Sequence, residues 1–238
     1  MHSTDKAARI AGAIYLSLVV FAPFSLIYVP NKLIVRGDAT ATAGNILTHE
    51  MLFRYGVFSD LIATVIFICL GIALYRLLRD VNRTQAWLMV SFVLVSSAVA
   101  FVNVVNELAA IILFQGGDFL SVFSKEQLNA LGMLFIRVHG QGIRVNELFW
   151  GLWLFPFGVL VMQSRFLPRI LGWWLILNGF AYVATSFTDL LAPQYSDLIS
   201  KITFPAMLGE VAIMLWLVIR GANVKQLPAA ALNGRGHS

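Results

Sequence analysis

The sequence predicts an all-α protein: a polytopic transmembrane bundle of six helices. Hydrophobic residues make up 59% of the 238-residue chain and charged residues 12%, against roughly 45–50% and about 25% in soluble domains. Six apolar runs are long enough to cross a bilayer, which takes about 20 residues. They cover residues 8–29, 50–79, 85–114, 133–163, 168–191 and 202–220. We therefore expect an integral membrane protein with the lipid bilayer as its surroundings.

The first run follows Lys6 and Arg9, as the core of a signal peptide would. However, it is too long for such a core, and no small-residue cleavage site closes it. We expect it to stay in the protein as a helix that ends at Pro30.

The fourth helix should begin before its apolar run. Ser124 followed three residues later by Gln127 is typical of a capping box at a helix start. We expect a bend at Gly140 or Gly142 and a kink at Pro156. Pro168 suits the first turn of the fifth helix, where a missing N–H costs nothing.

The distribution of basic residues predicts that both termini are cytoplasmic. With the N-terminus inside, Lys32, Arg36, Lys125 and Lys201 face outward. Most of the other basic residues then lie inside, as the positive-inside rule requires. They are Lys6, Arg9, Arg76, Arg79, Arg83, Arg165, Arg169, Arg220, Lys225 and Arg235. We expect one transmembrane domain over residues 1–226 and a disordered tail over residues 227–238.

The net charge of +5 does not indicate a nucleic-acid partner, because no basic block of five or more residues exists. The single cysteine, Cys69, lies in an apolar run and is expected to be a small buried hydrophobe. It cannot form a disulfide within the chain. The sequence leaves open whether the protein forms a homo-oligomer.

Several polar side chains interrupt the apolar runs, and on the predicted topology they fall mostly in the outer half of the membrane. A charge at the bilayer centre costs at least ~2.5–3.5 kcal/mol, so such groups face the interior of the bundle and pair with one another. We expect them to line one outward-facing polar pocket, as ligand-binding residues. They are Arg54, Asp60, Asn103, Asn106, Glu107, His139, Arg144, Glu147 and Glu210.

Two kinds of catalytic site use residues of these types: a metal site and the nucleophilic site of a serine hydrolase. The histidines and carboxylates could supply a metal site, but no HExxH or similar fixed spacing is present, so we predict no metal. Ser59 and Asp60 are sequence neighbours that cannot face each other on a helix, and the chain has no GxSxG motif. A serine hydrolase is therefore not indicated, and no cofactor is assigned.

Several stretches carry a family resemblance: ARIAGAIYL, LIVRGDATATAGNI, MLFRYGVFSDL, LYRLLRDVNR, HGQGI and the long segment from Phe149 to Tyr182. Over nearly its whole length the chain resembles a bacterial integral-membrane family known only as domain of unknown function 4386. The resemblance implies six spans and a bacterial cytoplasmic (inner) membrane, and it implies no activity. Arg54, Asp60 and His139 match the family pattern, Asn103 and Asn106 fit it loosely, and Glu107 and Glu147 lie outside it.

Three functions follow from these observations. The first is a membrane protein that binds or handles a small ligand or a lipid headgroup in its polar pocket. The alternative is an intramembrane hydrolase or transferase that uses Asp60, His139 and a glutamate. The third is a structural subunit of a membrane complex, whose polar cluster only holds helices together. Whether the protein is an enzyme stays open at this point.

Overall fold

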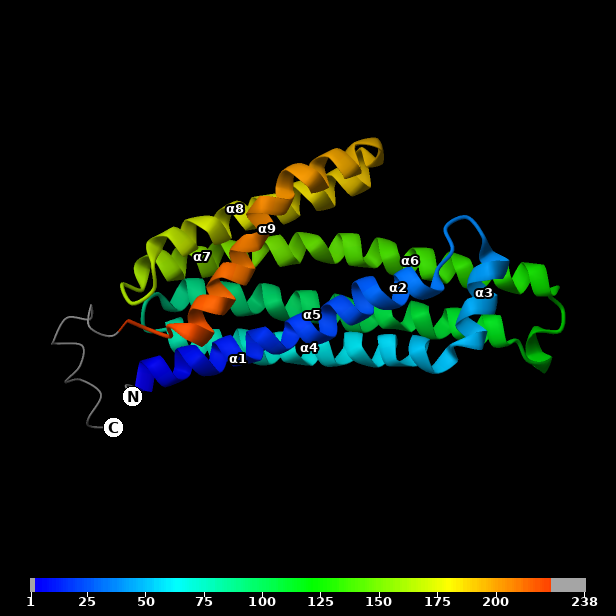
Figure 1. Cartoon of the computed structure of the whole chain (residues 1–238), viewed down its shortest axis with the longest axis horizontal. Coiled ribbons are helices and arrows are strands. Elements are labelled where there is room, and N and C mark those ends of the chain that lie inside the picture. Colours follow the sequence, from blue (N-terminus) through cyan, green and yellow to red (C-terminus); the bar gives the residue numbers. More distant parts are fainter. Residues whose placement is uncertain (1–2, 224–238) are drawn as a thin grey trace. The chain divides into compact units, whose positions relative to one another are not determined.

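Helices make up nearly all of residues 3–223, the part of the chain that the computed structural model describes, and no strand occurs among them (Figure 1). Six segments are long and apolar enough to span a membrane, which confirms the predicted fold class and the multi-pass membrane protein. They are Thr4–Leu33, Glu50–Leu78, Arg83–Gln115, Lys125–Gln163, Arg169–Leu191 and Pro193–Ile219. The predicted tail over residues 227–238 lies outside the described residues.

The chain divides into two compact units. Unit 1 takes its described residues from 1–16, 68–95 and 147–238, and unit 2 consists of residues 17–67 and 96–146. Four helices contribute to both: α1 (Ser3–Pro23), α4 (Glu50–Leu78), α5 (Arg83–Gln115) and α6 (Lys125–Leu152). Each unit is described by itself below.

The first span does not end at Pro30, and that prediction was wrong. A π-helical turn, η1 (Phe24–Tyr28), follows α1, and α2 (Val29–Leu33) continues from it. Val29 still donates its N–H to the Phe24 carbonyl, and Pro30, which has no N–H, follows it; the helix therefore passes over one missing backbone hydrogen bond instead of ending. The chain leaves the helix at Ile34, which is extended.

A short helix that the hydropathy pattern did not reveal, α3 (Ala39–Thr48), follows the first span. Asp38 caps it by accepting a hydrogen bond from the Ala41 N–H at 2.8 Å. Its buried face consists of Thr42, Ala43 and Ile46. The two apolar residues of that face join the core of unit 2.

The capping box at the start of α6 is confirmed. The Ser124 N–H donates to Gln127 Oε1 at 2.8 Å, and the Gln127 N–H donates to Ser124 Oγ at 3.3 Å. The helix runs unbroken through Gly140 and Gly142 and stops at Leu152. This end agrees with the kink expected from Pro156. Proline has no N–H to donate to the Leu152 carbonyl four residues earlier, and its ring collides with that carbonyl.

The chain resumes as α7 (Leu154–Gln163) in unit 1, followed by α8 (Arg169–Leu191), the turn η3 (Pro193–Tyr195) and α9 (Ser196–Ile219). α8 packs along both α7 and α9 (Figure 1). The approach to α7 is close enough that a Cβ added at Gly158 would lie 2.7 Å from the Gly172 carbonyl oxygen.

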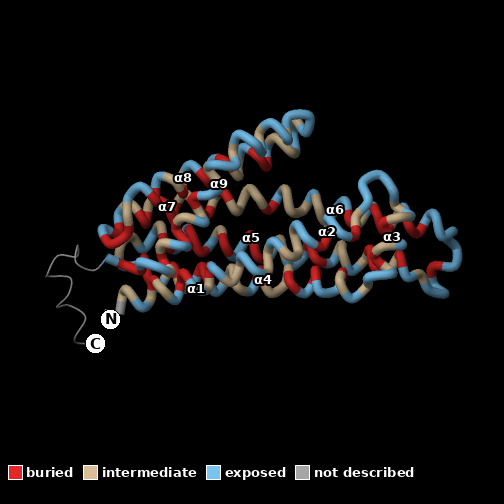
Figure 2. The backbone as a smooth tube through the Cα atoms, in the orientation of Figure 1, coloured by how far each residue is buried: buried red, intermediate tan, exposed pale blue. Residues whose placement is uncertain are grey.

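Exposed and buried residues alternate along the spans (Figure 2). Many of the exposed residues are large and apolar; Val102 and Ile170, for example, are 71% and 69% exposed. Such surfaces are unfavourable in water and favourable against lipid tails. They fit a bilayer environment for the six apolar segments.

Candidate functional site

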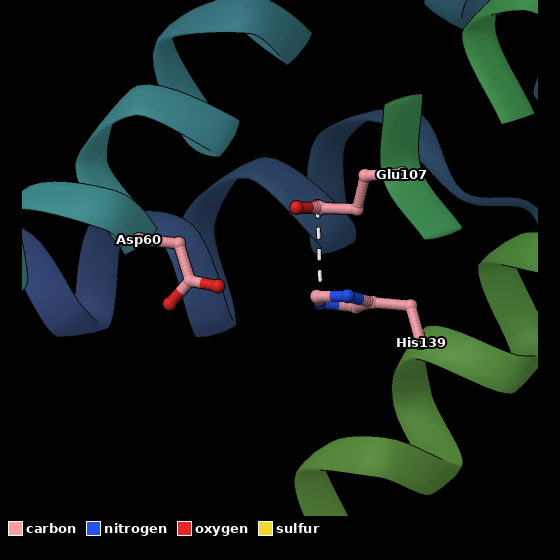
Figure 3. Close-up of side chains that lie close together, drawn as sticks. All are labelled: Asp60, Glu107 and His139. Carbon is pink, nitrogen blue, oxygen red and sulfur yellow. Dashed lines mark ion pairs between the residues drawn. The ribbon is translucent and has the colours of Figure 1, made fainter. Parts of the chain in front are cut away.

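Three ionisable side chains from three different spans meet in unit 2. They are Asp60 on α4, Glu107 on α5 and His139 on α6. One ligating atom of each lies within 4.8 Å of the others. Figure 3 shows the two carboxylates and the imidazole turned toward one another. We call these residues the triad.

Within the triad, His139 Nε2 lies 3.8 Å from Glu107 Oε1. This is too long for a hydrogen bond. Both side chains are largely buried, with exposed fractions of 13% for His139 and 16% for Glu107. Glu107 Oε2 is buried without a hydrogen-bond partner in the described part of the chain. The carboxylate therefore has unused capacity to bind a ligand.

The tautomer of His139 follows from its other nitrogen. Nδ1 lies 3.2 Å from the main-chain carbonyl oxygen of Asn103. Because a carbonyl oxygen can only accept, Nδ1 must carry the hydrogen. In the neutral ring, Nε2 then presents its lone pair to Glu107. A lone pair facing a carboxylate oxygen is unfavourable unless a proton or another cation lies between them.

Asn103 and Asn106 support the triad without belonging to it. Asn103 Nδ2 donates to the His139 carbonyl oxygen at 2.9 Å, and Asn106 Nδ2 donates to Asn103 Oδ1 at 3.1 Å. These bonds fix α5 against α6 beside the imidazole.

Gly142 makes this approach sterically feasible. A Cβ added at Gly142 would lie only 2.2 Å from Asn103 Oδ1, whereas a Cβ added at Gly140 would meet nothing within 4 Å. The two glycines of the HGQGI segment thus differ in role. The sequence predicted a bend at one of them, whereas α6 is one helix through both and Gly142 allows a close side-chain contact.

The other predicted pocket residues lie elsewhere. Arg54 Nε donates to Glu50 Oε1 at 2.7 Å in the first turns of α4. Arg144 is on α6 in unit 2, whereas Glu147 and Glu210 belong to unit 1. The nine residues are therefore divided between the two units.

Glu210 has a polar environment that the sequence analysis missed. The Tyr15 hydroxyl donates to Glu210 Oε1, and Asn178 Nδ2 donates to Oε2 at 3.4 Å. Tyr182 also hydrogen-bonds to Glu210 and interacts electrostatically with Glu147. A search for charged residues passes over these neutral partners.

The triad suits a cation better than an anion. It supplies one imidazole nitrogen and carboxylate oxygens from two residues. A phosphate headgroup would be repelled by the two carboxylates, whereas a divalent cation would be neutralised by them. Such neutralisation matters in a bilayer, where an unpaired charge is costly.

Similarity to known proteins shows which family the chain belongs to. The model of a domain of unknown function, DUF4386, matches residues 10–221. The chain belongs to this family. An uncharacterized protein of Archaeoglobus fulgidus is 25% identical over 173 residues, which cover 73% of this chain and 88% of that protein. No solved structure matches the chain. The family is thus confirmed, and it brings no activity with it.

Proposed function

We propose that this DUF4386 protein binds one divalent transition-metal ion through Asp60, Glu107 and His139 and uses it to hydrolyse a lipid-soluble substrate. The observation that carries the proposal is the convergence of three potential ligand atoms within 4.8 Å. Two atoms that each lie about 2.1 Å from one ion are roughly 3 to 4 Å apart. The 3.8 Å separation of His139 Nε2 and Glu107 Oε1 fits that range.

The second coordination layer supports a metal more than a simple ion pair. A metal-bound histidine usually donates its other ring N–H to a carbonyl or carboxylate, which orients the ring. The bond from His139 Nδ1 to the Asn103 carbonyl is of that kind. It leaves Nε2 free to bind a metal from inside the triad.

The donor set narrows the choice of metal. Imidazole suits zinc, iron and related ions, and carboxylates also suit manganese. A set of one nitrogen and two oxygens therefore favours Zn²⁺, Mn²⁺ or Fe²⁺ over Mg²⁺, which is usually held by oxygen ligands and water. Two carboxylates balance the charge of the divalent ion, so the loaded site is neutral.

The number of protein ligands favours catalysis over a structural role. Structural zinc sites generally have four protein ligands, whereas catalytic sites have three and keep a position open for water. A metal lowers the pKa of bound water and so supplies a hydroxide near neutral pH. Held by Asp60, Glu107 and His139, such a metal would supply the nucleophile for hydrolysis of an ester bond.

An apolar groove on α4 and α5 of unit 2 supports a lipid-soluble substrate. It has a volume of about 160 Å³ and is lined by Phe53, Arg54, Val57, Phe58, Leu61, Leu108 and Ile111. Leu61 and Leu108 directly follow the triad carboxylates Asp60 and Glu107. Adjacent helix residues differ by about 100° in direction but by only about 1.5 Å in height, so we infer that an acyl chain in the groove lies level with the triad.

The metal is tested on purified full-length protein in detergent. The protein is stripped with EDTA, reloaded with Zn²⁺ or Mn²⁺, desalted and analysed for elements. We expect one ion per chain in the wild type, loss of the ion in Glu107→Gln and His139→Gln, and retention in Glu50→Gln. Glu50 is a suitable control because its carboxylate pairs with Arg54 outside the triad. A wild type that retains no stoichiometric metal would overturn the proposal.

Hydrolysis is tested separately with 4-nitrophenyl octanoate in mixed micelles. We expect release of nitrophenolate by the reloaded wild type and not by the stripped protein or His139→Gln. If the protein binds the metal but does not hydrolyse the ester, the triad is a metal site and the proposed hydrolase activity is wrong. If the triad only holds the helices together, we expect neither metal binding nor hydrolysis.

A further inference from the structure

A second polar site lies in unit 1, around Glu210 on α9. Its donors come from two other helices, Tyr15 on α1 and both Asn178 and Tyr182 on α8. The Tyr15 hydroxyl bonds Oε1 of Glu210, and the Asn178 amide bonds Oε2. α8 and α9 lie side by side, so the site is built into a packed helix pair (Figure 1).

Asn178 gives this site an unused acceptor. The residue is 0% exposed, and its Oδ1 has no hydrogen-bond partner among the described residues. Its Nδ2 donates to the Met207 carbonyl oxygen at 3.3 Å and to Glu210 Oε2 at 3.4 Å. Because the Met207 carbonyl can only accept, the amide cannot be turned round to remove the deficit. A buried unpaired carbonyl oxygen is costly, so a bound ligand is expected to satisfy it.

The charges around Glu210 require a positive ligand. Its three hydrogen-bond donors are neutral phenol and amide groups, which orient the carboxylate without neutralising it. Glu147 adds a second carboxylate close to Tyr182. Inside a membrane such negative charge is stable only beside a cation.

The chemistry of the donors indicates which cation. Glu210, Asn178 and the two tyrosines offer only carboxylate, amide and phenol oxygens, which are hard ligands that prefer hard cations. Asn178 and Tyr15 are buried, at 0% and 5% exposure, and an enclosed site of this kind favours a small ion over an organic cation. A proton on Glu210 can be donated to a tyrosine oxygen, because a phenol also accepts, but it would leave Asn178 Oδ1 unsatisfied.

We propose that unit 1 binds a sodium ion between the Glu210 carboxylate and Asn178 Oδ1, with the tyrosine hydroxyls as further oxygen contacts. The site differs from the triad of unit 2 in its residues, its donor atoms and the charge of its ion. It stands independently of the hydrolase proposal.

The experiment follows thermal unfolding of the full-length protein in detergent at constant ionic strength, in NaCl, KCl or choline chloride. EDTA is present throughout to remove any transition metal. We expect the Tm to rise with Na⁺ and to saturate, with a much smaller rise in KCl and none in choline. Glu210→Gln keeps the size of the side chain and should abolish the Na⁺ effect. Glu50→Gln removes a carboxylate from unit 2 and should leave it unchanged.

Tyr182→Phe keeps the packing and removes one hydroxyl, so it should require about tenfold more Na⁺ for half-saturation. ²³Na NMR line broadening on the same samples reports binding even if a variant is less stable. Equal Tm values in the three salts would overturn the proposal. So would a Tm that responds to pH in choline chloride but not to Na⁺, because the site would then take a proton only.

Discussion

Asn103 and His139 are joined at two points: the Asn103 carbonyl accepts from His139 Nδ1 at 3.2 Å, and Asn103 Nδ2 donates to the His139 carbonyl at 2.9 Å. The first bond orients the imidazole, and the second fixes α5 against α6. One residue therefore sets both the ring position and the helix spacing that the triad needs. If the triad binds a metal, Asn103 is a positioning residue for it.

Asn103→Leu should weaken Zn²⁺ binding by roughly 10–100-fold, the usual effect of losing an outer-layer partner. The main-chain bond to Nδ1 can persist, so we expect weaker binding rather than complete loss. Competition with a chromogenic chelator measures the affinity.

Asn45→Leu is a matched control for this change. Asn45 Nδ2 also donates to a main-chain carbonyl in unit 2, that of Leu33 at 3.3 Å, but it is not a partner of the triad. This variant should keep the wild-type affinity. Equal weakening in both variants would assign the effect to general loss of stability.

Gly142→Ala should lower both the Tm and the metal affinity, because the new Cβ would lie 2.2 Å from Asn103 Oδ1. Asn103 would have to move and would carry its contacts with His139 along. Gly140→Ala, two residues away on the same helix, meets nothing within 4 Å and should be tolerated. Thermal unfolding and chelator competition on both variants give the comparison. If the two alanines behave alike, the contact between Gly142 and Asn103 is unimportant.

Asp60→Asn should separate metal binding from stability. In the metal-free protein Asp60 and Glu107 repel each other, so removing one charge should leave the Tm equal to or above that of the wild type. With excess Zn²⁺ the order should reverse, because only the wild type gains the binding free energy. Tm values with EDTA and with Zn²⁺ test both signs. A lower Tm in EDTA would mean that Asp60 has a structural role of its own.

Much of the fold could be predicted because lipid imposes simple rules. Long apolar runs gave the six spans, and local signals gave the capping box at Ser124 and the break before Pro156. The predicted end of the first span at Pro30 was wrong because the effect of a proline on a helix depends on the local backbone geometry, which hydropathy does not report. α3 was missed because it is short and its buried face is used only after the core of unit 2 has formed.

The candidate site was predictable in its residue types and not in its grouping. Asp60, Glu107 and His139 stood out because charge is rare in apolar runs. The repeated tetrapeptide VNEL placed Glu107 and Glu147 in equivalent local sequence, yet they lie in different units. Which carboxylate meets which partner depends on tertiary packing. Tyr15, Asn178 and Tyr182 are neutral and gave no signal until Glu210 was placed beside them.

Gly158→Ala should destabilise unit 1, because the added methyl would lie 2.7 Å from the Gly172 carbonyl oxygen and 2.8 Å from Ile176 Cγ1. α7 and α8 would have to separate, at a cost of about 1–3 kcal/mol for overpacking. Gly44→Ala is the matched control: this glycine is exposed on α3, and a Cβ there meets nothing within 4 Å. It should be neutral or stabilising by up to about 1 kcal/mol, since alanine favours helix. Unfolding in detergent measures both, and an unchanged Tm for Gly158→Ala would show that α7 and α8 tolerate a wider spacing.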